Sequence, residues 1–153
     1  MANTYSQLYL HLIFAVEGRR SLLLKPHRAE VEKYMVGITN SLNCRCMQIF
    51  CMPDHCHLLI SIHPDISTSR FVQQLKASSS AFINKQEWQK RKFNWQSGFG
   101  AFSYSKSQVP QVVRHIQNQE EHHKKPDFIE EYKAFLDKYE VSYDEKYIFS
   151  SNS

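Results

Sequence analysis

CRCMQIFCMPDHCHLLISIH, residues 44–63, contains two apolar runs with a short break between them. The runs, 44–52 and 55–63, have the length and the apolar content of buried strands. Pro53-Asp54 separates them and is typical of a tight connection. The short break between the two strands predicts an antiparallel hairpin or a tight connection.

Apolar spacing predicts elements on both sides of this hairpin. They are a strand at 5–16, a helix at 26–42, a helix at 67–90, a strand within 93–105, and helices at 108–125 and 128–139. With the hairpin, the order is β-α-β-β-α-β followed by helices, which is the order of the ferredoxin-like split-βαβ plan. We therefore predict an α+β fold in which helices cover one face of an antiparallel sheet and C-terminal helices follow.

The length of 153 residues fits one domain, which we predict over residues 1–150. The chain is 42% hydrophobic and 22% charged, which excludes an intrinsically disordered protein. No apolar run approaches the roughly 18–20 residues that cross a bilayer, and the N-terminus does not resemble a signal peptide. A cytoplasmic protein with no membrane partner is the expectation.

Charge is distributed unevenly along the chain. Residues 127–153 contain seven acidic and three basic residues, a net charge of −4, whereas the first 126 residues carry a net charge of +8. A basic body suits a polyanionic partner such as nucleic acid. An ordinary solvated surface would give the same counts, so both interpretations stay open at this point.

The four cysteines, Cys44, Cys46, Cys51 and Cys56, lie in or beside the predicted hairpin. A structural zinc site usually takes its ligands from C-x₂₋₄-C turns, and the spacing here does not have that form. We favour reduced, buried thiols that pack as small apolar groups. A Cys₄ zinc site is the alternative.

His55 and His57 are the first residues with the pattern of a functional site. Residues i and i+2 of a strand point to the same face, so the two imidazoles can share one divalent cation. The alternative is a pair of histidines on a solvent-facing strand. Cys56, Leu58 and Ile60 would then form its buried face.

The predicted helix at 108–125 carries a second polar set. His115 and Gln119 are four residues apart and are expected to share a face of this helix, which His122 continues. The apolar residues of the helix point elsewhere. A solvated polar face without function is the alternative.

Aromatic and basic residues alternate between residues 85 and 104. The aromatic residues are Trp88, Phe93, Trp95 and Phe99, and the basic ones are Lys85, Lys90, Arg91 and Lys92. Nucleobases stack on aromatic rings while cations contact phosphates, so this composition suits single-stranded nucleic acid. The alternative is that the aromatic rings belong to the core.

Three separated segments of the chain, taken together, are more specific than any one of the motifs above. They are residues 51–60 (CMPDHCHLLI), 95–103 (WQSGFGAFS) and 115–123 (HIQNQEEHH). In this order they resemble the small HUH-type single-tyrosine transposases of bacterial insertion sequences, including the REP-associated tyrosine transposases. The resemblance extends from about residue 5 to residue 147.

The resemblance implies a divalent cation, Mg²⁺ or Mn²⁺, bound by His55, His57 and Gln119. In such enzymes the cation polarises the scissile phosphate of single-stranded DNA, and DNA hairpins near the ends of the element are the substrates. A tyrosine one turn before the glutamine attacks the phosphorus, forms a 5′-phosphotyrosine link and frees a 3′-OH. The resemblance also implies a homodimer.

The chain departs from the family at the nucleophile, because His115 stands four residues before Gln119. Three explanations are open. The chain can bind hairpins and metal without cleaving. His115 can itself attack and form a phosphoramidate, since histidine serves as a covalent nucleophile, or it can become an additional metal ligand. Another tyrosine, Tyr104 or Tyr132, can replace it.

We therefore predict a metal-dependent single-stranded DNA transposase. It would bind, cleave and rejoin DNA hairpins, with His115 in the nucleophile position and Lys85, Lys90, Arg91 and Lys92 contacting DNA phosphates. The first alternative is a catalytically inactive relative that binds DNA hairpins. A remoter alternative is a ferredoxin-like protein that binds a small molecule or a metal and has no role on DNA.

Overall fold

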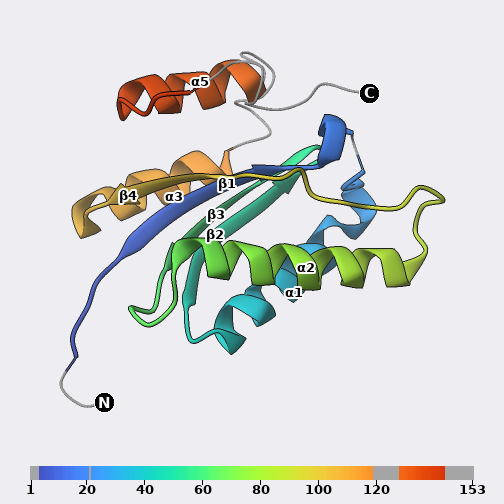
Figure 1. Ribbon diagram of the computed structural model, residues 1–153, viewed down its shortest axis with the longest axis horizontal. Helices are drawn as coiled ribbons and strands as arrows, with labels where there is room; N and C mark the ends of the chain where they lie inside the picture. Colours follow the sequence, from blue (N-terminus) through green and yellow to red (C-terminus); the bar gives the residue numbers. More distant parts are fainter. Residues whose placement is uncertain (1–3, 21, 119–127, 144–153) are drawn as a thin grey trace.

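A four-stranded antiparallel sheet with the strand order β2-β3-β1-β4 forms the centre of the fold (Figure 1). The computed structural model describes residues 4–20, 22–118 and 128–143. Its elements are, in chain order, β1 (Tyr9–Ala15), η1 (Glu17–Arg19), α1 (Lys25–Ser41), β2 (Arg45–Met52), β3 (His55–Ser61), α2 (Thr68–Gln86), β4 (Gly100–Tyr104), η2 (Lys106–Gln108), α3 (Val109–Gln117) and α5 (Phe128–Lys138). The predicted α+β class and the ferredoxin-like order are confirmed.

The hairpin predicted from residues 44–63 is formed by β2 and β3, with Pro53-Asp54 as the connection between them. Met52 pairs with His55 at the closed end of the hairpin. On its other side β3 pairs with β1, so β3 is an inner strand of the sheet. The first six residues of β3 are all buried as a result.

Two side chains of α1 close the outer edge of β2 at Cys51. The backbone nitrogen of Cys51 donates to Oε2 of Glu32 at 2.8 Å, and Nη1 of Arg28 donates to the carbonyl oxygen of Cys51 at 3.1 Å. An edge residue has no neighbouring strand to satisfy these two backbone groups. The contacts therefore join α1 to the strand that leads into the hairpin.

Helices cover both faces of the sheet (Figure 1). α1 and α2 pack on one face, as predicted, and bury the main core there. The sheet residues that contribute to this core are Leu12, Phe14, Val16, Cys51, Cys56, Leu58 and Ile60. Cys51 and Cys56 are thus buried thiols within the apolar core, with their Sγ atoms 3.5 Å apart.

The C-terminal helices α3 and α5 pack on the opposite face. Leu59 of β3 joins a cluster with Val112 and Ile116 of α3. Ile13 of β1 joins a second cluster with residues of α5, among them Tyr132. Because both faces are covered, a polar side chain on either face of an inner strand enters the protein interior.

Two predicted helices are shorter than expected. α2 ends at Gln86 because Glu87 adopts a left-handed conformation with φ of 58°. α3 ends at Gln117, and the backbone nitrogen of Asn118 bonds to carbonyl groups of the last turn. The predicted helix over 108–125 is therefore interrupted at Asn118, and residues 119–125 lie outside the described residues. Among the helices that are described, none has both the length and the apolar content that a membrane crossing requires.

A close contact between β4 and α5 gives a test of where α5 docks. A Cβ atom added at Gly100 would lie 2.6 Å from both Cε1 and the hydroxyl oxygen of Tyr132. We expect Gly100→Ala to lower the free energy of unfolding by about 1–3 kcal/mol, because a buried ring has to move. Urea denaturation measures this difference.

Gly37→Ala in α1 is the matched control, since nothing lies within 4 Å of a Cβ atom at that position. It should raise the free energy of unfolding by about 1 kcal/mol through helix propensity. In the background of Tyr132→Leu, Gly100→Ala should lower the free energy of unfolding by a smaller amount. Equal effects of the two glycine substitutions would contradict the docking of α5 on β4.

Candidate metal centre and nucleic-acid interface

His55 and His57 lie on the same face of β3, which is the face that α3 and α5 cover. Their side chains are 1% and 0% exposed, and their ring centroids are 5.1 Å apart. The alternative of a solvent-facing strand is therefore wrong. Two buried imidazoles next to each other need polar partners, because burial of an unpaired polar group costs free energy.

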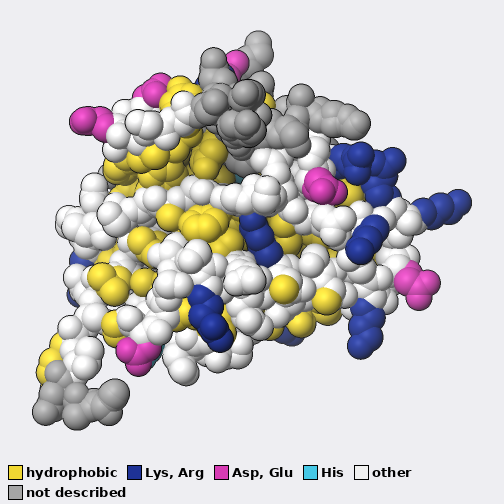
Figure 2. All heavy atoms as spheres, in the orientation of Figure 1, with side chains coloured by type: hydrophobic (Ala, Val, Ile, Leu, Met, Phe, Trp, Pro, Cys, Tyr) yellow, Lys and Arg dark blue, Asp and Glu magenta, His cyan; other side chains and the backbone are white. Residues whose placement is uncertain are grey.

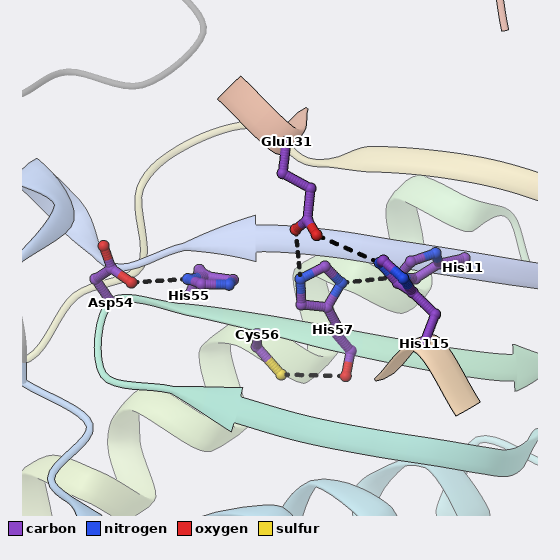
Figure 3. Close-up of polar contacts among 7 residues, drawn as sticks. All are labelled: His11, Asp54, His55, Cys56, His57, His115 and Glu131. Atoms are coloured by element: carbon purple, nitrogen blue, oxygen red, sulfur yellow. Dashed lines mark hydrogen bonds and ion pairs between the residues drawn. The ribbon is translucent and has the colours of Figure 1, made fainter. Parts of the chain in front are cut away.

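Each of the two imidazoles has a partner at its Nδ1 atom (Figure 3). Nδ1 of His55 lies 2.7 Å from Oδ1 of Asp54, the preceding residue in the hairpin connection. Nδ1 of His57 lies 2.9 Å from Nε2 of His11, which comes from β1. A metal-binding histidine commonly donates one ring N–H to such a partner and binds the cation through the other nitrogen. In both histidines that other nitrogen is Nε2.

Glu131 of α5 brings a carboxylate to this cluster (Figure 3). Its Oε1 lies 3.6 Å from Nε2 of His57, and its Oε2 lies 3.3 Å from Nε2 of His115 in α3. The carboxylate thus lies between the proposed metal ligand and the residue in the nucleophile position. His115 is 31% exposed, so solvent and substrate can reach one side of the cluster.

Burial controls the charge of His11. It lowers the pKa of His11 to about 3, the nearby His115 acts in the same direction, and Glu131 acts in the opposite direction. His11 is therefore a neutral imidazole at physiological pH. A neutral imidazole has one donor and one acceptor nitrogen, so it can accept a hydrogen bond from His57.

The donor chemistry of His55 and His57 fits a divalent cation, because two imidazoles whose Nδ1 atoms each have a partner point from one strand face. Within the described part of the chain, no group of three or more His, Cys, Asp or Glu side chains is arranged to hold a metal ion. Gln119, the third predicted ligand, lies outside the described residues, as does His122. The shared helix face of His115 and Gln119 therefore stays a prediction, because only His115 lies in the described helix α3.

A cavity of about 300 Å³ lies beside the cluster, between the sheet and the two C-terminal helices. Its lining includes His11, His115 and Glu131, together with Tyr104, Gln108, Gln111, Phe135 and Lys138. The cavity therefore gives access to the residue in the nucleophile position.

The two tyrosines named as replacements for the nucleophile have different surroundings. Tyr132 is buried against the sheet, and burial raises its pKa to about 12. Tyr104 lines the cavity next to His115, but burial, followed by the neighbouring Tyr139 hydroxyl, raises its pKa. Both hydroxyl groups are harder to deprotonate than a solvated tyrosine, and Tyr132 is a core residue.

The basic residues predicted to contact DNA lie on the surface where α2 ends. Lys85, Lys90, Arg91 and Lys92 are exposed, and the last three line a cavity of about 630 Å³ that also includes Trp88. Lys and Arg side chains gather at this end of the molecule in Figure 2. The Trp88 ring stacks on His27 with a centroid distance of 4.1 Å.

The core alternative is correct for two of the four aromatic residues in this segment. Phe93 is fully buried and Trp95 is 9% exposed, and both belong to the core cluster beneath α1 and α2. Trp88 and Phe99 are partly buried and pack against that cluster. The basic residues and parts of the Trp88 and Phe99 side chains are thus available to a ligand.

Three residues of the cluster were not predicted from the sequence as site residues: His11, Asp54 and Glu131. Asp54 directly precedes His55, so its adjacency was the available signal. His11 stands in an alternating strand and Glu131 in an amphipathic helix, and neither pattern distinguishes them from ordinary residues. Only the pairing of β1 with β3 and the docking of α5 bring them to His57.

The chain was compared with known families and curated proteins. The family model described as "Transposase IS200 like" matches residues 4–119. The transposase for insertion sequence element IS200 of Salmonella typhimurium is 30% identical over 86 residues, which is 56% of this chain and 57% of that protein. The ISDra2 transposase TnpA of Deinococcus radiodurans is 26% identical over 120 residues, 74% of this chain and 84% of that protein. The chain thus spans little more than half the length of the IS200 relative.

Two solved structures share the fold. A candidate transposase from Deinococcus radiodurans R1 superposes with a TM-score of 0.62 at 22% identity, covering 78% of this chain and 95% of that one. A REP-associated tyrosine transposase bound to a REP hairpin superposes with a TM-score of 0.61 at 14% identity, covering 80% of this chain and 73% of that one.

Proposed function

The chain belongs to the IS200-like transposase family, and on that premise we propose that it is a metal-dependent transposase acting on single-stranded DNA hairpins. The observation that carries the proposal is the arrangement of His55 and His57. They lie side by side on one strand face with Nδ1 of each held by a partner, and His115 lies on the other side of the Glu131 carboxylate. The related structure bound to a REP hairpin supports hairpins as the substrate class.

His55 and His57 would hold Mg²⁺ or Mn²⁺ through their Nε2 atoms, with Gln119 as a third ligand by family resemblance. The bound cation would supply Lewis acidity toward the scissile phosphate and fix its orientation. The chain's own contribution is to hold both imidazoles in place through a partner at each Nδ1 and to bury them on their strand face. By the same resemblance we propose a homodimer.

His115 would act as the nucleophile through one ring nitrogen. Glu131 lies 3.3 Å from its Nε2 and would hold a proton there, which leaves the lone pair on Nδ1 for the attack. A bond forms between Nδ1 and phosphorus, and the bond from phosphorus to the 3′ oxygen breaks. The oxygen leaves with the electron pair and takes up a proton, so the products are a phosphoramidate on His115 and a free 3′-OH.

A catalytically inactive hairpin-binding protein is the second candidate. An imidazole is shorter than a phenol, so His115 cannot reach as far from α3 as the tyrosine of the family does. A displacement on the order of 1 Å can lower a rate about 100-fold. The 3.3 Å contact between Nε2 of His115 and the Glu131 carboxylate further favours this candidate, because it holds the imidazole against α5.

A covalent-adduct assay distinguishes the two candidates. The protein is mixed with labelled single-stranded hairpin DNA from its own genomic flanks and Mn²⁺, and adducts are resolved on a denaturing gel. The transposase with His115 as nucleophile predicts an acid-labile adduct that His57→Ala abolishes. The inactive candidate predicts no adduct for the natural chain and an acid-stable adduct for His115→Tyr.

Tyr104→Phe is the control for a different nucleophile, because Tyr104 lines the same cavity as His115. Loss of the adduct in this variant, with the adduct kept in His115→Ala, would contradict both candidates. An adduct that forms equally well in His57→Ala would contradict the metal centre.

Hairpin binding should weaken with salt and depend on the basic residues at the end of α2. Phosphate contacts release counterions, so the logarithm of the affinity falls with the logarithm of the salt concentration. We expect the double variant Lys90→Ala/Arg91→Ala to weaken binding at low salt and to reduce that slope by about one per lost contact. Fluorescence anisotropy at several salt concentrations measures both.

Lys33→Ala on the exposed surface of α1 is the matched control, and we expect it to leave the salt slope unchanged. A hairpin affinity that is independent of salt would contradict a role on DNA. A slope that falls equally in Lys33→Ala would show that charge, and not position, decides binding.

A further inference from the structure

We infer that His11 is a positioning residue for the metal centre: it accepts the Nδ1–H of His57 and so leaves Nε2 of His57 for the cation. The inference rests on the proposed function, because His11 can position a metal ligand only if His55 and His57 bind a cation. His11 itself would touch neither the cation nor DNA. Its effect would pass through the tautomer and the orientation of the His57 ring.

The geometry of the sheet places His11 next to His57. Ile13 pairs with His57 and His11 with Leu59, so the two histidines are diagonal neighbours on one face of the β1–β3 pair. Nε2 of His11 and Nδ1 of His57 are 2.9 Å apart, and both side chains are 0% exposed. The contact is thus a buried hydrogen bond between two rigid strands.

A hydrogen bond between two neutral imidazoles needs one donor and one acceptor, which allows two arrangements. In the first, His11 donates from Nε2 and His57 accepts at Nδ1. His57 then carries its proton on Nε2 and cannot bind a cation there. In the second, His57 donates from Nδ1 and His11 accepts, so that Nε2 of His57 presents a lone pair. A cation on His57 therefore requires His11 to be the acceptor.

The surroundings of His11 suit the role of acceptor. The edge of the Phe135 ring packs against the His11 ring at a centroid distance of 5.4 Å, and Tyr104 lies on another side at 6.3 Å. The His11 ring is fully buried among these groups. Nδ1 of His11 makes no hydrogen bond within the described residues, so only His57 sets which nitrogen of His11 carries the proton.

His55 differs from His57 in this respect. Its Nδ1 faces the carboxylate of Asp54, and an ionised carboxylate can only accept. This contact favours the tautomer of His55 that carries its proton on Nδ1. His57 is held by a partner that can either donate or accept, so the two ligands are supported by chemically different partners.

The experiment is a Mn²⁺ titration, followed by electron paramagnetic resonance of the free ion, on the natural chain and on two variants of similar size. His11→Phe keeps a ring but removes the acceptor. His11→Gln keeps an amide oxygen close to the position of Nε2. We expect His11→Phe to weaken Mn²⁺ binding about 10–100-fold and His11→Gln to restore most of the affinity, since loss of such a partner has effects of that size.

Phe135→Leu is the control for packing, because Phe135 contacts the His11 ring without a hydrogen bond to His57. Its Mn²⁺ affinity should match that of the natural chain. Equal affinity of His11→Phe and the natural chain would overturn the inference alone. Absence of Mn²⁺ binding in the natural chain would overturn the proposed metal centre, and the inference with it.

A second measurement does not require the variants to fold. Long-range proton–nitrogen correlation spectra of the natural chain, labelled with nitrogen-15 histidine and saturated with diamagnetic Mg²⁺, report which ring nitrogen carries each proton. We expect the proton of His57 on Nδ1 and that of His11 on Nδ1. A proton on Nε2 of His11 in the Mg²⁺-bound protein would overturn the inference.

Discussion

The inner position of β3 is the constraint on which the rest of the structure depends. A strand that is paired on both sides and covered on both faces buries every side chain that it carries. Alternation sends Cys56, Leu58 and Ile60 into the core beneath α1 and α2, and it sends His55 and His57 to the opposite face. Two imidazoles in the interior require polar partners, which the hairpin connection and β1 provide at Nδ1 of each ring.

The elements were predictable because hydrophobic periodicity is local, and the hairpin was readable from two apolar runs with the Pro53-Asp54 break between them. The site was predictable only in part. His55 and His57 are two residues apart, so their shared face follows from the strand itself. His11 lies 46 residues away in sequence from His57, and no local pattern contains that contact. The end of α3 at Gln117 was also missed, because the polar residues that follow do not break helical spacing.

The docking of α5 has one favourable and one unfavourable contribution to its free energy. Tyr132 and Leu136 bury apolar surface against the sheet, which stabilises the docked helix. Glu131, on the same helix, brings a carboxylate into a poorly solvated position between His57 and His115, and desolvation of a charge is unfavourable. Positive charge on the facing imidazoles, or on a cation, would offset that cost. The docking of α5 and the chemistry of the site are therefore thermodynamically linked.

The hydrogen bonds of Arg28 and Glu32 to the Cys51 backbone have a consequence for the chain during its synthesis. An exposed strand edge is a template on which other chains can add strands and aggregate. α1 precedes β2 in the chain, so the two side chains that cover this edge are synthesised before the edge itself. The edge of β2 at Cys51 can thus be covered as soon as β2 forms.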